Sequence, residues 1–267
     1  MLKWLSLPLA LIAYTILSIG LVLMKKGIDW IGYKGPKDQT YRKNLHTWLL
    51  GFFFINLCII PNTLSLKHLD PHIVTAMAGW GVIVMVFLSS KVLKERIFRS
   101  DFLGTGLIVG AILLLNLFEQ KESVENTKIL SYAFLSVFPF LLLIPAFLKS
   151  LSKKTRSILF AAVAGISTGM IVVTMNILVM EFGFHIGSFF SSVFLYSYLL
   201  FSITTFLAIQ FAYKTGYMMI AGPVQYSLGI IYPVLCAYFV FDHRIHWVQI
   251  LSVFILTYGV SSILKKR

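Results

Sequence analysis

Charge is scarce in this sequence. Only 12% of its 267 residues are Asp, Glu, Lys or Arg, whereas 58% are hydrophobic and the mean hydropathy is +0.86. A soluble domain carries roughly twice that charged fraction. The deficit excludes an ordinary soluble fold and indicates an all-α polytopic membrane protein.

Further absences exclude other classes of protein. The two cysteines, Cys58 and Cys236, both lie inside apolar runs, so we expect neither a disulfide framework nor a cysteine metal site. No nucleophile stands beside a base and no phosphate-binding loop is present, so we expect no enzyme activity and no cofactor. The net charge of +13 comes from basic residues between apolar runs, which is typical of membrane topology rather than of nucleic-acid binding.

Carboxylates are nearly absent from the interior of the apolar runs. Magnesium prefers carboxylate and other hard oxygen ligands, and a charge inside a membrane is costly and usually functional. Glu181, at the end of one run, is the best acidic candidate for a metal ligand. An interfacial position explains this residue more simply, so we expect no metal site.

Nine apolar runs are long enough to cross a bilayer as helices, which takes about 20 residues each. They cover residues 4–24, 46–66, 71–92, 101–118, 129–149, 157–180, 188–212, 218–240 and 246–264. If the links alternate in side, eighteen of the 23 Lys and Arg residues fall on one side and five on the other. The basic side is cytoplasmic. We therefore expect an integral protein of the plasma (inner) membrane with its N-terminus outside and its C-terminus inside.

The two halves of the chain contain matching residues at a nearly constant spacing of 148 or 149. The matches are Ser18-Ile19-Gly20 with Ser167-Thr168-Gly169, Asn62 with Gln210, and Arg96-Ile97 with Arg244-Ile245. They predict one transporter domain over 1–267, in which repeat one is 1–120, a connecting helix is 129–149 and repeat two is 156–267. Since five helices separate equivalent positions, the repeats are inverted, a plan that places a substrate site near the midplane between them.

Uncharged polar residues inside the runs are the candidates for binding a neutral or zwitterionic solute. The predicted substrate-binding set is Asn62, Thr63, His72, Thr75, Trp80, Asn176, Gln210, Tyr213, Gln225 and Tyr226. Interhelical hydrogen bonding, worth about 0.6 kcal/mol per bond, is the alternative role for each of them. Pro61 and Pro223 are expected to kink their helices and free backbone carbonyls. Two pairs of small residues, Gly106 with Gly110 and Gly165 with Gly169, predict close helix packing.

Several of these segments together resemble the drug/metabolite transporter superfamily, of the EamA-like kind. The residues that carry the resemblance are the run from Leu64 to Ile97, Lys25-Lys26-Gly27, Trp48, Gly51, Asn62, Ile73-Val74-Thr75, Lys94-Glu95-Arg96, Gln210, Pro223, Tyr226 and Phe241. Within the superfamily the pattern is most similar to the NIPA-like magnesium transporter branch. The resemblance implies a secondary transporter.

The substrate stays open between two classes. The NIPA-like branch implies magnesium, but its glutamate in the second span is replaced here by Ile59 or Phe53, which favours an uncharged or organic solute. A membrane scaffold or receptor subunit without transport is the alternative from another class. The expected partners are the lipid bilayer and a small-molecule or ion substrate, with no nucleic acid. The oligomeric state stays open between a monomer and a homodimer.

Overall fold

The protein is helical, as the sequence predicts. The structure is a computed structural model that describes residues 3–31, 33, 35, 38–66, 77–117, 127–148, 150–182, 189–242 and 245–265, and within these ranges it contains no strand. Seven helices are long and apolar enough to cross a membrane. Large apolar side chains such as Leu130 and Phe134 are exposed on their surfaces. Lipid is the solvent that suits such surfaces, so this is a helical integral membrane protein.

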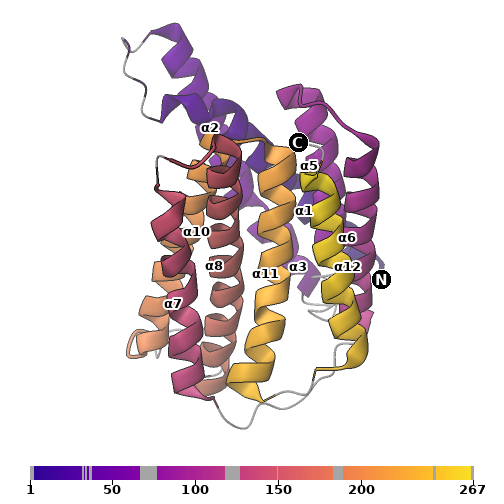
Figure 1. Ribbon diagram of the computed structural model, residues 1–267, viewed down its shortest axis with the longest axis vertical. Helices are drawn as coiled ribbons and strands as arrows, with labels where there is room; N and C mark the ends of the chain where they lie inside the picture. Colours follow the sequence, from indigo (N-terminus) through magenta and orange to yellow (C-terminus); the bar gives the residue numbers. More distant parts are fainter. Residues whose placement is uncertain are drawn as a thin grey trace. The chain divides into compact units, whose positions relative to one another are not determined.

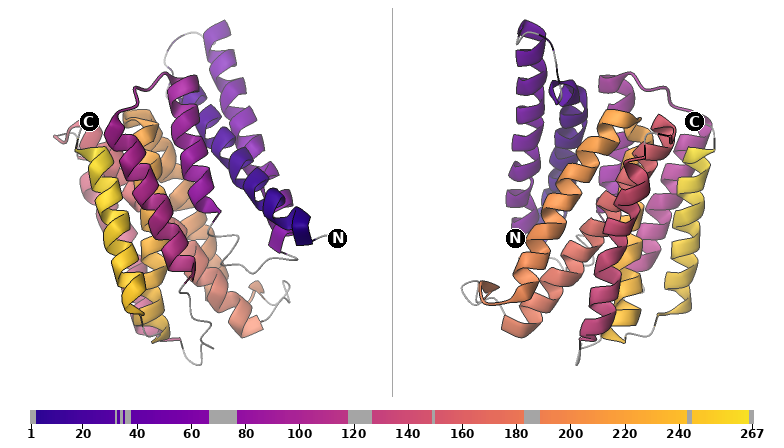
Figure 2. Two further views of the ribbon diagram at one scale, coloured as in Figure 1. Left: turned by 90° about the vertical axis from the view of Figure 1, so that its right-hand side faces the viewer. Right: turned by 60° about the vertical axis from the view of Figure 1, so that its left-hand side comes forward.

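The chain divides into two compact units, which are described separately. Unit 1 consists of Met1–Glu119, Tyr217–Pro223 and Leu251–Arg267. It contains α1 (Lys3–Gly27), η1 (Ile28–Trp30), α2 (Gln39–Leu57), α3 (Ile59–Leu66), α5 (Ala78–Leu93) and α6 (Arg99–Leu117). Helix α1 is its centre, because α2, α3 and α5 all pack against it. The neighbouring α1 and α2 are visible in both views of Figure 2.

Glycines allow α1 and α2 to approach closely. A Cβ atom built on Gly51 would lie 2.6 Å from the carbonyl oxygen of Gly20, and one built on Gly20 would lie 2.8 Å from the carbonyl oxygen of Gly51. Real Cβ atoms essentially never lie so close to a backbone atom. Only glycine therefore fits at either position.

Helix α2 ends at Leu57 and α3 begins at Ile59, so the span expected over 46–66 is interrupted at Cys58. Pro61 follows three residues later and is buried. Because proline has no N–H, the carbonyl of Leu57 loses its usual i+4 donor, and this is the physical reason for a break at this point. Hydrogen bonding resumes at once, since the amide of Asn62 donates to the carbonyl of Cys58 (3.1 Å).

Unit 2 consists of Gln120–Gly216 and Val224–Ile250. It contains α7 (Ile129–Ala146), α8 (Lys153–Phe182) and α10 (Val193–Thr215), and it shares α11 (Met218–Phe241) and α12 (Trp247–Leu264) with unit 1. Helix α8 packs against both α7 and α10, and the three lie side by side in Figure 1. Its Gly165 and Gly169 meet α11 at Gln225 and at Pro233, which confirms the predicted close packing at this pair.

The close packing predicted for Gly106 and Gly110 is wrong. Among the described residues, no atom of another element lies within 4 Å of a Cβ atom built on either glycine. The tight approach on α6 is made instead by Gly104, whose Cβ atom would lie 2.6 Å from the carbonyl oxygen of Gly259 on α12. The i, i+4 spacing therefore identified a face of α6 on which the described residues place no close neighbour.

One predicted helix boundary also needs correction. The span expected to begin at residue 188 forms helix α10 only from Val193. Ser192 accounts for the later start, because its backbone is extended and its side chain accepts a hydrogen bond from the amide of Phe194 (3.2 Å). A serine that satisfies a free amide in this way is a strong N-cap.

The turn between α5 and α6 in unit 1 has a distinctive local structure. Helix α5 ends at Leu93, and Lys94 follows in the left-handed region with a φ of 57°. Helix α6 begins at Arg99. Just before it, the amide of Phe98 donates to the Asp101 carboxylate (2.8 Å), and the amide of Asp101 donates back to the Phe98 carbonyl (2.9 Å). This reciprocal pair satisfies two amides at the helix start.

The turn between α11 and α12 in unit 2 repeats these features. Helix α11 ends at Phe241, Asp242 follows with a φ of 61°, and α12 begins at Trp247. The amide of His246 donates to the Gln249 side chain (2.9 Å), and the amide of Gln249 donates back to the His246 carbonyl (2.9 Å). Each of these five positions lies 148 residues after its counterpart in the first turn. Asp242 and Lys94 are the non-glycine residues with positive φ in the described part of the chain.

Candidate substrate-binding residues

A polar seam joins α1 to α5 in unit 1. The hydroxyl of Ser18 donates to the carbonyl of Gly81 (2.8 Å), and the indole N–H of Trp80 donates to the hydroxyl of Thr15 (3.0 Å). Trp80, one of the predicted binding residues, is 42% exposed. Its polar atom is thus held by α1 while much of its ring stays open, which suits a ring that stacks on a ligand.

Asn62 is the predicted binding residue of unit 1 with unused hydrogen-bonding capacity. Its side-chain oxygen Oδ1 is buried and has no hydrogen-bond partner among the described residues. The hydroxyl of Ser65 donates to the Asn62 backbone carbonyl (2.7 Å), which leaves the side chain uninvolved. Thr63, the next residue, is exposed. A buried amide oxygen without a partner is unusual in a native protein and marks a position where a ligand or water can donate.

In unit 2 the predicted residues lie on three helices. Gln210 and Tyr213 are buried in α10, and Gln225 and Tyr226 are partly buried in α11. Asn176 on α8 is exposed instead. Within this set, the oxygen Oε1 of Gln225 is buried and has no partner among the described residues.

Helix α8 packs directly against α11 at Gln225. A Cβ atom built on Gly165 would lie 2.5 Å from the carbonyl oxygen of Gln225, so the two backbones are in direct contact. Pro223, two residues earlier, lies inside the continuous helix α11 and is buried. Gln225 therefore lies on a continuous helix in close contact with α8, and its amide oxygen has no partner among the described residues.

Two of the predicted substrate-binding residues and the acidic metal candidate add nothing to either group of polar residues. His72 and Thr75 lie outside the described residues. Glu181 is exposed near the end of α8. The described part of the chain contains no group of three His, Cys, Asp or Glu side chains able to hold a metal ion.

Glu95 is not among the predicted binding residues, because the sequence analysis names it only within the Lys94-Glu95-Arg96 motif. Lys94 and Arg96 are exposed, but Glu95 is only 8% exposed. Its two carboxylate oxygens accept hydrogen bonds from the backbone amides of Met218 (2.8 Å) and Met219 (3.0 Å). A lone acidic residue in a basic run was the available signal, but its partner lies 123 residues away in the sequence.

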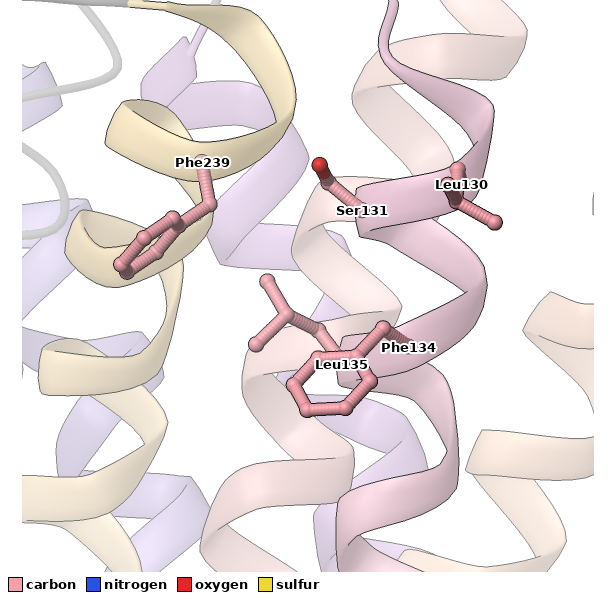
Figure 3. Close-up of a pocket in the computed structure, with 5 residues that line it drawn as sticks. All are labelled: Leu130, Ser131, Phe134, Leu135 and Phe239. Carbon is pink, nitrogen blue, oxygen red and sulfur yellow. The ribbon is translucent and has the colours of Figure 1, made fainter.

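A groove of about 440 Å³ opens between α7 and α11 in unit 2. Figure 3 shows its lining residues, which are Leu130, Ser131, Phe134, Leu135 and Phe239. Four of these five side chains are apolar, and Phe134 is 77% exposed. The groove therefore belongs to the apolar surface of the unit and offers a polar solute a single hydroxyl.

Comparisons with family models, with curated proteins and with solved structures gave no match to this chain. The apolar helices define the class of the protein, which is a helical integral membrane protein. Each of its two units contains a buried amide oxygen, that of Asn62 in unit 1 and that of Gln225 in unit 2.

Proposed function

We propose that this protein is a secondary transporter that moves a small solute across the membrane by alternating access between two inverted repeats. The observation that carries the proposal is the agreement of the α5–α6 and α11–α12 turns at a constant spacing of 148 residues. The agreement includes a rare positive φ at a non-glycine position and the same reciprocal pair of hydrogen bonds. Two unrelated turns rarely share all of these, so a duplicated four-helix unit is the simplest explanation.

A nine-span topology makes these repeats inverted, because five spans then separate equivalent helices. Seven helices qualify as spans by length and composition, and α5 and α6 complete the proposed nine. The 16 described residues of α5 rise about 24 Å, less than the roughly 30 Å hydrocarbon core. The sequence extends this apolar segment back to residue 71, outside the described part. Inverted repeats are a common transporter plan. The bias of the basic residues supports an N-terminus outside and a C-terminus inside.

The proposed solute is uncharged or zwitterionic, such as an organic metabolite. The supporting observation is the chemistry of the buried atoms that have no partner in the described part of the chain, which include the amide oxygens of Asn62 and Gln225 and the hydroxyls of Ser167 and Ser227. Such groups bind N–H and O–H donors without needing a counter-charge, whereas magnesium prefers carboxylates with retained waters. A NIPA-like magnesium transporter is the alternative substrate assignment, and a non-transporting scaffold or receptor subunit is the alternative function.

Transport assays in proteoliposomes test the organic-solute proposal, the magnesium alternative and the scaffold or receptor alternative. Osmotic shrinkage and recovery, followed by light scattering, measures the entry of neutral solutes such as amides, amino acids and nucleosides. A trapped magnesium-sensitive dye measures entry of magnesium. We expect recovery with one class of organic solute and a fivefold to hundredfold loss in Asn62→Leu, because a polar contact with the solute is worth about 1–3 kcal/mol.

Asn56→Leu is the matched control. Asn56 lies in the same span, is exposed, and uses its side-chain amide to donate to the Phe52 carbonyl of its own helix (2.8 Å). Its replacement should leave solute entry unchanged. Magnesium entry that Asn62→Leu abolishes would replace the organic solute by the NIPA-like assignment. If folded protein admits neither magnesium nor any solute of the panel, the transporter proposal fails and the scaffold alternative stands.

A further inference from the structure

Helix α11 receives hydrogen bonds at its start from a residue far away in the sequence. The carbonyl of Tyr217 accepts hydrogen bonds from the amides of Ile220 (3.2 Å) and Ala221 (3.0 Å), so Tyr217 occupies the N-cap position. Its phenol side chain is not among the short polar side chains that cap a helix start. The amides of Met218 and Met219 therefore need partners from elsewhere in the chain.

Glu95 supplies both partners. Each of its carboxylate oxygens accepts one of the two amides, at 2.8 Å for Met218 and 3.0 Å for Met219. A carboxylate at this position also complements the positive end of the helix dipole. Met218 is fully buried and Glu95 nearly so, which keeps water from taking the place of the carboxylate. Lys25 of α1 lies within electrostatic range of Glu95, so a cation balances the buried charge.

The same turn of α11 also lies against a side chain of α5. A Cβ atom built on Gly222 would collide with the side chain of Met85, which is itself fully buried. Pro223 follows at once and has no N–H, so the carbonyl of Met219 lacks its usual i+4 donor. The grouping of α11 changes here, because Tyr217–Pro223 belong to unit 1 and the rest of the helix to unit 2.

We propose that Glu95 is a positioning residue for the candidate binding residues of α11. By accepting the amides of Met218 and Met219, it holds the first turn of the same continuous helix that carries Gln225 and Tyr226. The role rests on the proposed transport function, in which these two residues contact the solute. Glu95 itself does not touch the solute.

The test measures the position of α11 beyond Pro223 without any solute. Ser227, one turn past the proline, is 2% exposed and its hydroxyl has no partner among the described residues. Ser227→Cys therefore breaks no described hydrogen bond, and its labelling reports whether this part of α11 becomes exposed. Purified protein in nanodiscs is treated with a maleimide, and the modified peptides are quantified by mass spectrometry. We expect Glu95→Gln to raise the labelling rate of this cysteine by about tenfold, because an NH2 group then replaces one of the two oxygens that each accept an amide.

Two controls accompany the reporter. Gln249→Ala removes a side chain that accepts an amide within its own turn of α12 (2.9 Å), and it should leave the labelling rate as in Ser227→Cys alone. Ala161→Cys reports on folding, because Ala161 is fully buried in α8 and should stay unlabelled in the Glu95→Gln background. If it becomes labelled, Glu95→Asp replaces Glu95→Gln, since it keeps the charge but shortens the reach.

Hydrogen exchange at the amides of Met218 and Met219 completes the experiment. Faster exchange in Glu95→Gln together with faster labelling of Ser227→Cys supports the proposal. Faster exchange with unchanged labelling would make Glu95 a local cap only and overturn it, and no change in either would overturn it as well. A chain that moves no solute would remove the proposed transport function, and that result comes from the proteoliposomes, independently of the labelling.

Discussion

Helix α6 carries two glycines whose substitution should have opposite effects on stability. A Cβ atom added at Gly104 would lie 2.6 Å from the carbonyl oxygen of Gly259 and 2.6 Å from Cγ1 of Ile263, and a backbone carbonyl cannot move aside alone. We expect Gly104→Ala to cost about 1–3 kcal/mol, the usual range for overpacking. Gly106→Ala meets no described atom within 4 Å and should gain up to about 1 kcal/mol from helix propensity.

Reversible unfolding by sodium dodecyl sulfate in mixed micelles, followed by circular dichroism, measures both variants. Two further glycines extend the comparison. Gly259→Ala should behave like Gly104→Ala, because its Cβ atom would lie 2.9 Å from the carbonyl oxygen of Gly104, and Gly110→Ala should behave like Gly106→Ala. Equal losses at Gly104 and Gly106, or a larger loss at Gly106, would refute the packing of α6 against α12.

Two other contacts give predictions of smaller size, both measured by the same unfolding titration. Ser18→Ala removes the buried hydrogen bond to the Gly81 carbonyl and should cost about 1 kcal/mol; a loss below a few tenths would mean that the α1–α5 seam does not depend on it. Lys128→Ala removes an exposed ion pair with Asp242 (2.8 Å) and should cost less than about 1 kcal/mol, because both side chains are at least half exposed. A loss of several kcal/mol in Lys128→Ala would contradict the exposed position of this ion pair.

Most helix positions follow from composition and end signals. The apolar run 218–240 corresponds to α11 (Met218–Phe241), and 246–264 corresponds to α12 (Trp247–Leu264), because a membrane leaves a helix as the only open-ended structure that satisfies its own backbone. The break at Cys58 was not predicted as a helix end. Proline announces a local disturbance, but whether the helix bends or stops depends on the packing around it.

The sequence could not supply the partners of the polar residues. Asn62, Gln225 and Trp80 were all named as uncharged polar residues inside apolar runs, a criterion that says nothing of their partners. The buried oxygens of Asn62 and Gln225 have no partner among the described residues, which agrees with a binding role without testing it. The N–H of Trp80 already has a partner in Thr15. Glu95 was named only within the Lys94-Glu95-Arg96 motif, because its buried position depends on Met218, which is distant in the sequence.

The spacing of small residues illustrates the same limit. Two glycines four residues apart share a helix face, which the sequence shows for both pairs. Whether another helix lies on that face is a property of the tertiary fold. Gly165 meets Gln225, whereas Gly106 meets nothing within 4 Å among the described residues.

The interleaving of the two units has a consequence for how the chain is made. Unit 1 needs Tyr217–Pro223 and Leu251–Arg267, and unit 2 needs Val224–Ile250. The start of α7 is held by a bond from the Lys128 amide to the Val240 carbonyl (2.9 Å). Neither unit is complete while a ribosome is still at Gly216, because each includes segments that follow this residue. Domains normally fold one after another during synthesis, whereas here unit 2 is complete only at Ile250 and unit 1 only at Arg267.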